Sequence, residues 1–230
     1  MKNMGIRRLN WDSDFFGFEI GEIDIDAEFS NAACFDLLII RQILNKIIKI
    51  ENFENTFQET KVVFSKILNS NTSNGFDNSV VDFDKIPAKN ASFYPLAFES
   101  GKYSRFKLDT KLNHKFEMLY SKWIDNSLNK QFADKIFYLE EQNEIIGFIT
   151  FKKVKNFATV GLLAVAQDQQ GKGIGRKLLS KVEKYCISQN ILELRIPTQK
   201  ENLPACYFYS KMGYEIIEEI TIKHYWKKNK

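Results

Sequence analysis

The pattern of apolar and polar positions after residue 100 predicts a continuous series of strands and helices. Alternating or short continuous apolar segments predict strands over residues 134–141, 144–154, 157–166, 191–197 and 214–226. Apolar positions at helical spacing predict helices over residues 116–128, 173–188 and 203–212. Short connections join the first three strands, which predicts that they run antiparallel to one another.

The residues before position 101 show a second, smaller set of elements. Residues 15–25 predict an extended segment and residues 61–67 predict a strand. Helical spacing between them predicts a helix that includes Leu37, Ile40, Leu44, Ile47 and Ile48. Residues 104–109 predict one more short strand. We therefore expect a small α/β extension over residues 1–100 and a main domain over residues 101–230.

The composition predicts a globular protein of the cytoplasm. The chain has 230 residues, 44% of them hydrophobic, and a formal net charge of +4 with basic residues scattered along the sequence, so nucleic-acid binding is not predicted. The three cysteines and two histidines lack metal-ligand or disulfide spacing, and His224 is expected on a strand face. No signal peptide or membrane-spanning run is visible, so no membrane association is expected.

Three glycines, Gly171, Gly173 and Gly175, fall within five residues between a predicted strand and a predicted helix. In such a turn, peptide N–H groups converge on an anion without side chains in the way, and the helix N-terminus adds partial positive charge. The spacing differs from the G-x-G-x-x-G fingerprint and from the P-loop. The turn therefore predicts a different phosphorylated ligand, with a tight turn that binds nothing as the alternative.

The segment from Gln170 to Gly175 resembles the Q/R-x-x-G-x-G/A signature of the GNAT superfamily of N-acetyltransferases, with a strand before it and a helix after it. The resemblance implies an α/β (α+β) fold whose mixed, mostly antiparallel central sheet is flanked by helices. It also implies acetyl-coenzyme A as cosubstrate and no metal. The implied coenzyme-binding residues are Leu163, Ala164 and Val165 on the strand, for the pantetheine arm and acetyl carbonyl, and Gln170, Gly171, Lys172, Gly173, Ile174 and Gly175 in the turn, for the pyrophosphate.

A second segment, NLPACYFYSKMGY from Asn202 to Tyr214, resembles the N-x-x-A-x-x-x-Y-x-x-x-G-Y/F segment of the same superfamily. The resemblance implies that Asn202 contacts the coenzyme and that Tyr209 protonates the departing thiolate. The alternatives are a helix N-cap role for Asn202 and a core position for Tyr209. Tyr207 lies roughly 200° from Tyr209 around a helix, so the two are not expected to face the same cleft.

Three further segments are similar to a narrower group, the bacterial TDP-fucosamine acetyltransferases. They are LNWDSDFFGFEIG near the start, YSRFKLD from Tyr103 and LYSKWIDNS from Leu119. The resemblance implies a small-molecule amine acceptor, a TDP-linked 4-amino-4,6-dideoxy sugar. The aromatic residues of these segments also suit a purely structural role, and Arg105 is read as an exposed strand arginine, so no acceptor-binding residue is assigned.

Two other functions remain open at the level of sequence. One is a GNAT acetyltransferase that acts on a protein amine or another small-molecule amine, and the other is a non-catalytic module that binds acyl-coenzyme A. The strand TVGLLAV carries no carboxylate, so no general base is assigned there. The oligomeric state is also left open, with a homodimer among the options.

Overall fold

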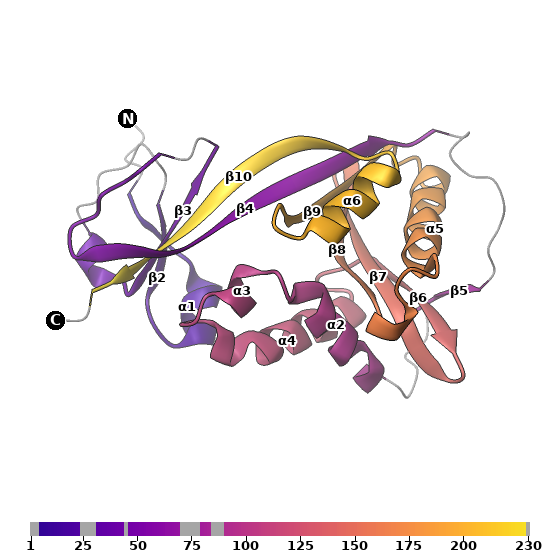
Figure 1. Cartoon of the computed structure of the whole chain (residues 1–230), viewed down its shortest axis with the longest axis horizontal. Coiled ribbons are helices and arrows are strands. Elements are labelled where there is room, and N and C mark those ends of the chain that lie inside the picture. Colours follow the sequence, from indigo (N-terminus) through magenta and orange to yellow (C-terminus); the bar gives the residue numbers. More distant parts are fainter. Residues whose placement is uncertain (1–4, 24–30, 44–45, 70–78, 84–89, 229–230) are drawn as a thin grey trace.

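The computed structural model describes residues 5–23, 31–43, 46–69, 79–83 and 90–228 (Figure 1). The strands are β1 (Arg7–Arg8), β2 (Ile20–Ile23), β3 (Leu37–Gln42), β4 (Phe53–Ile67), β5 (Val80–Asp82), β6 (Lys135–Glu141), β7 (Glu144–Val154), β8 (Phe157–Val165), β9 (Glu193–Gln199) and β10 (Glu215–Lys227). The α-helices are α1 (Asn10–Phe16), α2 (Phe93–Gly101), α3 (Arg105–Leu108), α4 (Phe116–Leu128), α5 (Ile174–Ser188) and α6 (Leu203–Lys211).

The strands of the described residues form one mixed sheet in the order β1-β2-β3-β10-β4-β9-β8-β7-β6-β5. The β2–β3 and β8–β9 pairs are parallel, and the other neighbours are antiparallel. The predicted fold class, a mostly antiparallel sheet flanked by helices, is therefore confirmed. So are the predicted strands and helices between residues 116 and 227, whose bounds agree with prediction to within about two residues, the usual uncertainty of element ends.

Two predicted elements are wrong. The predicted helix that begins at Leu37 is strand β3, because Leu37, Leu38, Ile39 and Ile40 are buried on both faces of the sheet and their spacing mimics a helix only by chance. Ile43 and Ile47 are exposed, and Leu44 lies outside the described residues. The predicted strand 104–109 is instead the short helix α3.

The predicted extended segment 15–25 is correct only in part. Its first residues, Phe15 and Phe16, belong to α1, which ends at Gly17 in the left-handed conformation. Residues 20–23 form strand β2. Residues 24 and 25 lie outside the described part of the chain.

The long strand β4 connects the two halves of the sequence. It pairs with β10 from Phe53 to Ser65 on one edge and with β9 from Lys61 to Ile67 on the other. Figure 1 shows β4 and β10 as a twisted ribbon along the molecule. A strand from the first hundred residues is thus central to the sheet. The division of the chain near residue 100 into two domains stays a prediction.

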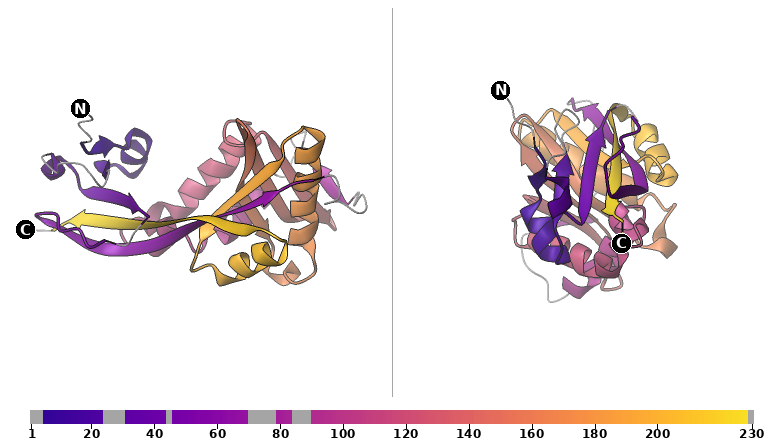
Figure 2. Two further views of the ribbon diagram at one scale, coloured as in Figure 1. Left: turned by 90° about the horizontal axis from the view of Figure 1, so that it is seen from above. Right: turned by 90° about the vertical axis from the view of Figure 1, so that its left-hand side faces the viewer.

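Helices cover both faces of this sheet. α2 and α4 form a core cluster with apolar residues of β3, β7 and β10. α5 and α6 form a second cluster on the other face, with Phe64 of β4 and Leu194 of β9. Seen from above in Figure 2, α4 and α6 lie on opposite sides of the β4–β10 ribbon. Among the described residues, no helix is long and apolar enough to cross a membrane.

A buried polar cluster fixes the end of α3 against β10. His224 lies on the face of β10, as predicted, and is fully buried. Its Nδ1 atom is 2.6 Å from Oδ2 of Asp109, and Trp226 donates its indole N–H to the same oxygen over 3.0 Å. The carboxylate therefore compensates for the burial of Nδ1 of His224 and Nε1 of Trp226, whereas Nε2 of His224 has no partner among the described residues.

The central position of β4 predicts that replacing its side chains with alanine lowers stability by different amounts along the strand. Phe64 is 1% exposed and packs against Tyr209, whereas Ile67 at the end of the strand is 69% exposed. We expect Phe64→Ala to lower the free energy of unfolding by about 3–5 kcal/mol through cavity formation. We expect Ile67→Ala to change it by about 0.5 kcal/mol or less. Urea denaturation measures both, and equal losses would contradict a central role for β4.

Candidate active site

A large cavity opens where two parallel strands separate. β8 pairs with β9 only at Ala158–Leu194 and Thr159–Arg195, and beyond these positions the strands diverge. The cavity has a volume of about 1070 Å³ and is bordered by Val160 to Val165 of β8 and by Ile196 to Gln199 of β9. Both strands therefore present their edges, with main-chain N–H and C=O groups, to the cavity.

A β-bulge shapes the β8 side of this opening. Ile149 pairs with Leu163 and Phe151 with Val160, so β8 has two residues, Gly161 and Leu162, opposite the single residue Thr150. The hydroxyl of Thr150 accepts a hydrogen bond from the N–H of Leu162 over 2.9 Å. A Cβ atom on Gly161 would lie 2.8 Å from that hydroxyl, so the bulge requires glycine here.

The glycine turn lies at one end of the cavity and begins α5. Gly171 and Gly173 have φ values of +78° and +81°, which favour glycine, and no atom lies within 4 Å of a Cβ built on either residue. Gly173 is the N-cap residue of α5. The turn thus provides free space beside peptide N–H groups at a helix N-terminus, which is the geometry that binds phosphate. Gly175 is different, because its Cβ position faces the ring of Phe208.

The structure brings nearly all of the predicted coenzyme-binding residues to one cavity. Leu163, Ala164, Val165, Gln170, Gly171, Gly173, Ile174, Gly175 and Asn202 all border it. Lys172 does not border it, but its Nζ atom donates to Oε1 of Gln169, which does, over 2.8 Å. The Gln170 amide donates to the carbonyl of Val165 and to Glu99 of α2, both over 3.2 Å, and so ties the turn to the end of β8.

Asn202 has the capping role that the sequence offered as an alternative. Its Oδ1 atom accepts a hydrogen bond from the N–H of Ala205 over 3.3 Å at the start of α6, and Pro204 follows in the first turn. Asn202 also borders the cavity. The capping prediction is confirmed, and a contact between Asn202 and the coenzyme stays a prediction.

Tyr209 is a buried residue in the wall of the cavity. It is 6% exposed, and its ring packs against Phe64, Phe208 and Tyr214. Burial raises the pKa of its hydroxyl well above the ordinary tyrosine value, so the group stays protonated at neutral pH. Tyr209 thus packs in the hydrophobic core and also borders the cavity.

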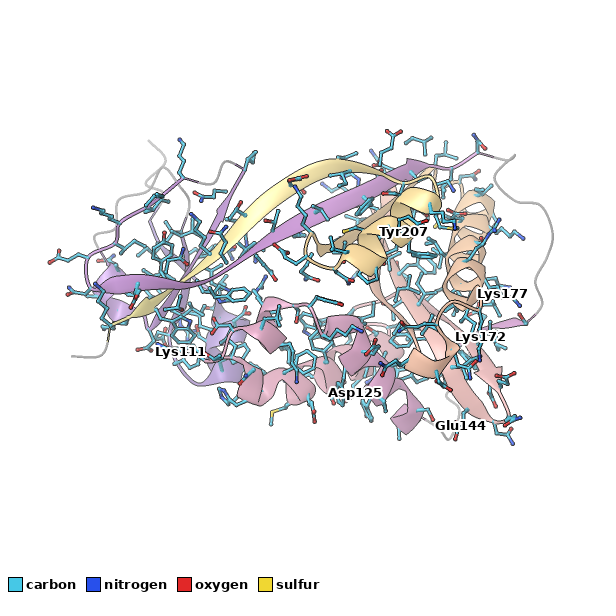
Figure 3. The ribbon with its side chains drawn as sticks, viewed as in Figure 1. Lys111, Asp125, Glu144, Lys172, Lys177 and Tyr207 are labelled. Atoms are coloured by element: carbon cyan, nitrogen blue, oxygen red, sulfur yellow. The ribbon has the colours of Figure 1, made fainter. Side chains whose placement is uncertain are left out.

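Tyr207 also borders the cavity, which corrects the prediction that the two tyrosines cannot face the same cleft. The reason is that α6 lies along a wide opening, which residues on both sides of the helix can reach. Tyr207, which is labelled on α6 in Figure 3, is 69% exposed.

Sequence reasoning missed several charged residues of the cavity. Arg176 borders it from the first turn of α5. A cation at a helix N-terminus opposes the helix dipole, and this local signal could have indicated an anionic ligand. The cavity is also bordered by Arg41, Glu59 and Lys61. No motif or spacing in the sequence around these residues indicates that they belong to a site. Arg105 is not the exposed strand arginine that was expected: it begins α3 and its side chain is only 15% exposed.

Comparison with known proteins identifies a family. A model of the "Acetyltransferase (GNAT) family" matches residues 100–214. Streptothricin acetyltransferase of Escherichia coli is 31% identical over 83 residues, which cover 35% of this chain and 48% of that protein. Streptothricin acetyltransferase A of Bacillus subtilis is 30% identical over 128 residues, 52% of this chain and 69% of that protein. The chain thus spans about half the length of the first of these relatives.

Solved structures share the fold at low sequence identity. A GCN5-related N-acetyltransferase from Sphaerobacter thermophilus superimposes with a TM-score of 0.57 at 9% identity. The match covers 84% of this chain and 60% of that one. At this identity the likeness concerns the fold alone.

The open space in the glycine turn predicts that one added methyl group weakens coenzyme binding while the protein still folds. Gly173→Ala would place a methyl group in the open space of the turn, and we expect it to weaken coenzyme A binding by about tenfold or more. The positive φ alone should cost about 1–2 kcal/mol of stability. Isothermal titration calorimetry measures the affinity and thermal denaturation the stability.

Gly213→Ala is the matched control. Gly213 has the same φ of +81° but follows α6, outside the residues that border the cavity. We expect a similar loss of stability with unchanged coenzyme A affinity. A folded Gly173→Ala variant that binds coenzyme A like the wild type would refute the role of the turn.

Proposed function

The chain belongs to the acetyltransferase (GNAT) family, and on this premise we propose that it transfers the acetyl group of acetyl-coenzyme A to the amine of a small molecule. The observation that carries the proposal is the meeting of three elements at one cavity: the glycine turn, the free edge of β8 and Tyr209. A phosphate-binding turn, main-chain donors and a protonated phenol are together what acetyl transfer from a thioester needs.

The described residues fit acetyl-coenzyme A, which would supply the acetyl thioester. The open space beside Gly171 and Gly173, with the N-terminus of α5 and the guanidinium of Arg176, suits its pyrophosphate. The edge of β8 after the bulge suits its pantetheine arm, because an extended chain can hydrogen-bond to a strand edge. Leu163, Ala164 and Val165 provide that edge.

The proposed chemistry is direct attack. The acceptor nitrogen bonds to the carbonyl carbon, the carbon–sulfur bond breaks, and the proton lost by the amine passes to water. Main-chain N–H groups of β8 stabilise the negative charge on the carbonyl oxygen. Tyr209 donates its proton to the sulfur and regains a proton from water, and the raised pKa of its hydroxyl keeps the group protonated at neutral pH before the transfer.

The finer proposal is that the acceptor is a nucleotide-linked amino sugar of the TDP type. Two of the three segments that carry the sequence resemblance contribute to the cavity: Tyr103, Arg105 and Phe106 from one, and Tyr120 and Trp123 from the other. A cavity of about 1070 Å³ is also at the large end of the range for small-molecule sites. The third segment, with Trp11, does not border the cavity.

A second candidate is transfer to another amine, such as streptothricin. The support is the sequence similarity to two streptothricin acetyltransferases. The test for both candidates is an acceptor screen that measures release of coenzyme A from acetyl-coenzyme A, with a TDP-amino sugar, streptothricin and a polyamine as acceptors. Turnover on streptothricin alone would reject the finer proposal, and binding of acetyl-coenzyme A without turnover on any amine would favour a non-catalytic binding module.

The proposed role of Tyr209 predicts a specific loss of turnover. Tyr209→Phe keeps the ring and its contacts with Phe64 but removes the proton donor. We expect the turnover rate to fall by roughly 100-fold or more, while coenzyme A affinity and thermal stability change little. Steady-state kinetics with a saturating acceptor measures this effect.

Tyr207→Phe is the control on the same helix. Its ring is exposed at the rim of the cavity, so turnover should remain near the wild-type value. An equal loss in both variants, or no loss in Tyr209→Phe, would show that Tyr209 is not the proton donor.

A further inference from the structure

The cavity has a second, charged end on the side of α3, away from the glycine turn. Figure 1 shows α3 beside the β4–β10 ribbon, with α5 on the far side of α6. Arg41, Glu59, Lys61 and Arg105 border this end. Arg41 of β3 is opposite Ile222 of β10, which is in turn opposite Glu59 of β4. Arg41 and Glu59 therefore point from the same face of the sheet, and Lys61 follows on that face two residues later.

Arg105 is fixed in this cluster but is not fully satisfied. Its backbone N–H donates to Oε2 of Glu59 over 2.9 Å, and its Nη1 atom lies 3.7 Å from Oε1 of the same carboxylate. The guanidinium also stacks over the ring of Phe106 at 4.4 Å. Its Nε atom is buried and has no hydrogen-bond partner among the described residues. A buried guanidinium donor without a partner is costly, so this atom indicates a missing acceptor.

Lys61 is a cation without a counter-ion in direct contact. Its side chain makes no hydrogen bond or ion pair with the residues that the structure describes, although the residue borders the cavity. Partial burial lowers the pKa of its ammonium group, Arg41 and Arg105 lower it further, and Glu218 and Glu59 oppose the change. Arg41 meanwhile donates to Glu22 of β2, which does not border the cavity. Asp12 lies near both arginines but does not border the cavity either. Glu59 is the carboxylate that borders this end of the cavity together with Arg41, Lys61 and Arg105.

We propose that Arg41, Lys61 and Arg105 bind an anionic group of the acceptor, so that the acceptor is an amine that also carries a phosphate or a carboxylate. This inference rests on the proposed acetyl transfer to an amine and names the residues that select the acceptor. An anion would accept hydrogen bonds from Nε of Arg105 and Nζ of Lys61 and would relieve the repulsion among the three cations. A polyamine would add positive charge to the same end, which repulsion disfavours.

Glu59 acts in this site as a positioning residue. Its carboxylate accepts the backbone N–H of Arg105 from a strand 46 residues earlier in the chain, and so holds the start of α3 against β4. Glu59 is 4% exposed, and burial raises the pKa of its carboxyl group while Arg105 lowers it. The acceptor's anionic group therefore meets a guanidinium whose position is already fixed, which reduces the ordering cost of binding.

The experiment is calorimetric titration of inorganic pyrophosphate, citrate and spermidine into the protein saturated with coenzyme A, which occupies the glycine turn. We expect at least one of the two anions to bind, less tightly as salt is added, and spermidine not to bind. Lys61→Met should weaken that anion's binding by about tenfold or more and leave coenzyme A affinity unchanged. A preference for pyrophosphate identifies a phosphate group in the acceptor, and a preference for citrate a carboxylate.

Lys200→Met is the matched control, because Lys200 lies beside β4 but pairs with exposed Glu219 outside the cavity. It should bind the anion like the wild type. Arg105→Gln should also weaken anion binding. If that variant does not fold, Lys61→Met decides alone, since the backbone pairing of Lys61 with β9 and β10 is kept and its side chain has no ion pair with the described residues to lose.

The inference is overturned if neither anion binds, if Lys61→Met binds the anion like the wild type, or if spermidine binds more tightly than both anions. Failure of the proposed function gives a different result. In that case no amine releases coenzyme A from acetyl-coenzyme A, although the anion still binds in a manner that depends on Lys61. Equal acetyl transfer to spermidine and to anionic amines would reject the inference about the acceptor but would support the proposed acetyltransferase function.

Discussion

The separation of β8 from β9 is the constraint on which the rest of the site depends. Each strand is paired along its other edge, β8 with β7 on both sides of the bulge and β9 with β4, and this pairing holds the two strands apart. The bulge at Gly161 and Leu162 further sets the course of β8 away from β9. The cavity is therefore built into the sheet. Its walls are strand edges, whose positions are fixed by long ladders of hydrogen bonds.

The pairing of β9 with β4 also explains why the early part of the chain belongs to the site. β4 carries Glu59 and Lys61 to the cavity on one face and places Phe64 against Tyr209 on the other. A single strand thus supports the proposed proton donor and forms part of the proposed acceptor site. Loss of β4 would remove both at once, together with the partner that keeps β9 in place.

The sequence predicted the parts of this structure that local interactions determine. The three antiparallel strands β6, β7 and β8 and the helix α5 follow from short-range periodicity. The glycine turn follows from the conformational freedom of Gly171 and Gly173. The failures have a common cause in long-range contacts. Leu37 to Ile40 form a strand because β10 and β2 pair with them on both edges, and α3 is stabilised by Glu59, which is far away in the sequence. The burial of Arg105 follows from the same contact.

The two anion-binding ends proposed for the cavity differ in the groups they use. At the glycine turn, the proposed binding depends mainly on peptide N–H groups, whose positions follow from backbone conformation, with Arg176 as an added cation. On the α3 side, it depends on the side chains of Arg41, Lys61 and Arg105, which come from three separate elements. A change of side chain can therefore alter the choice of acceptor without altering the turn.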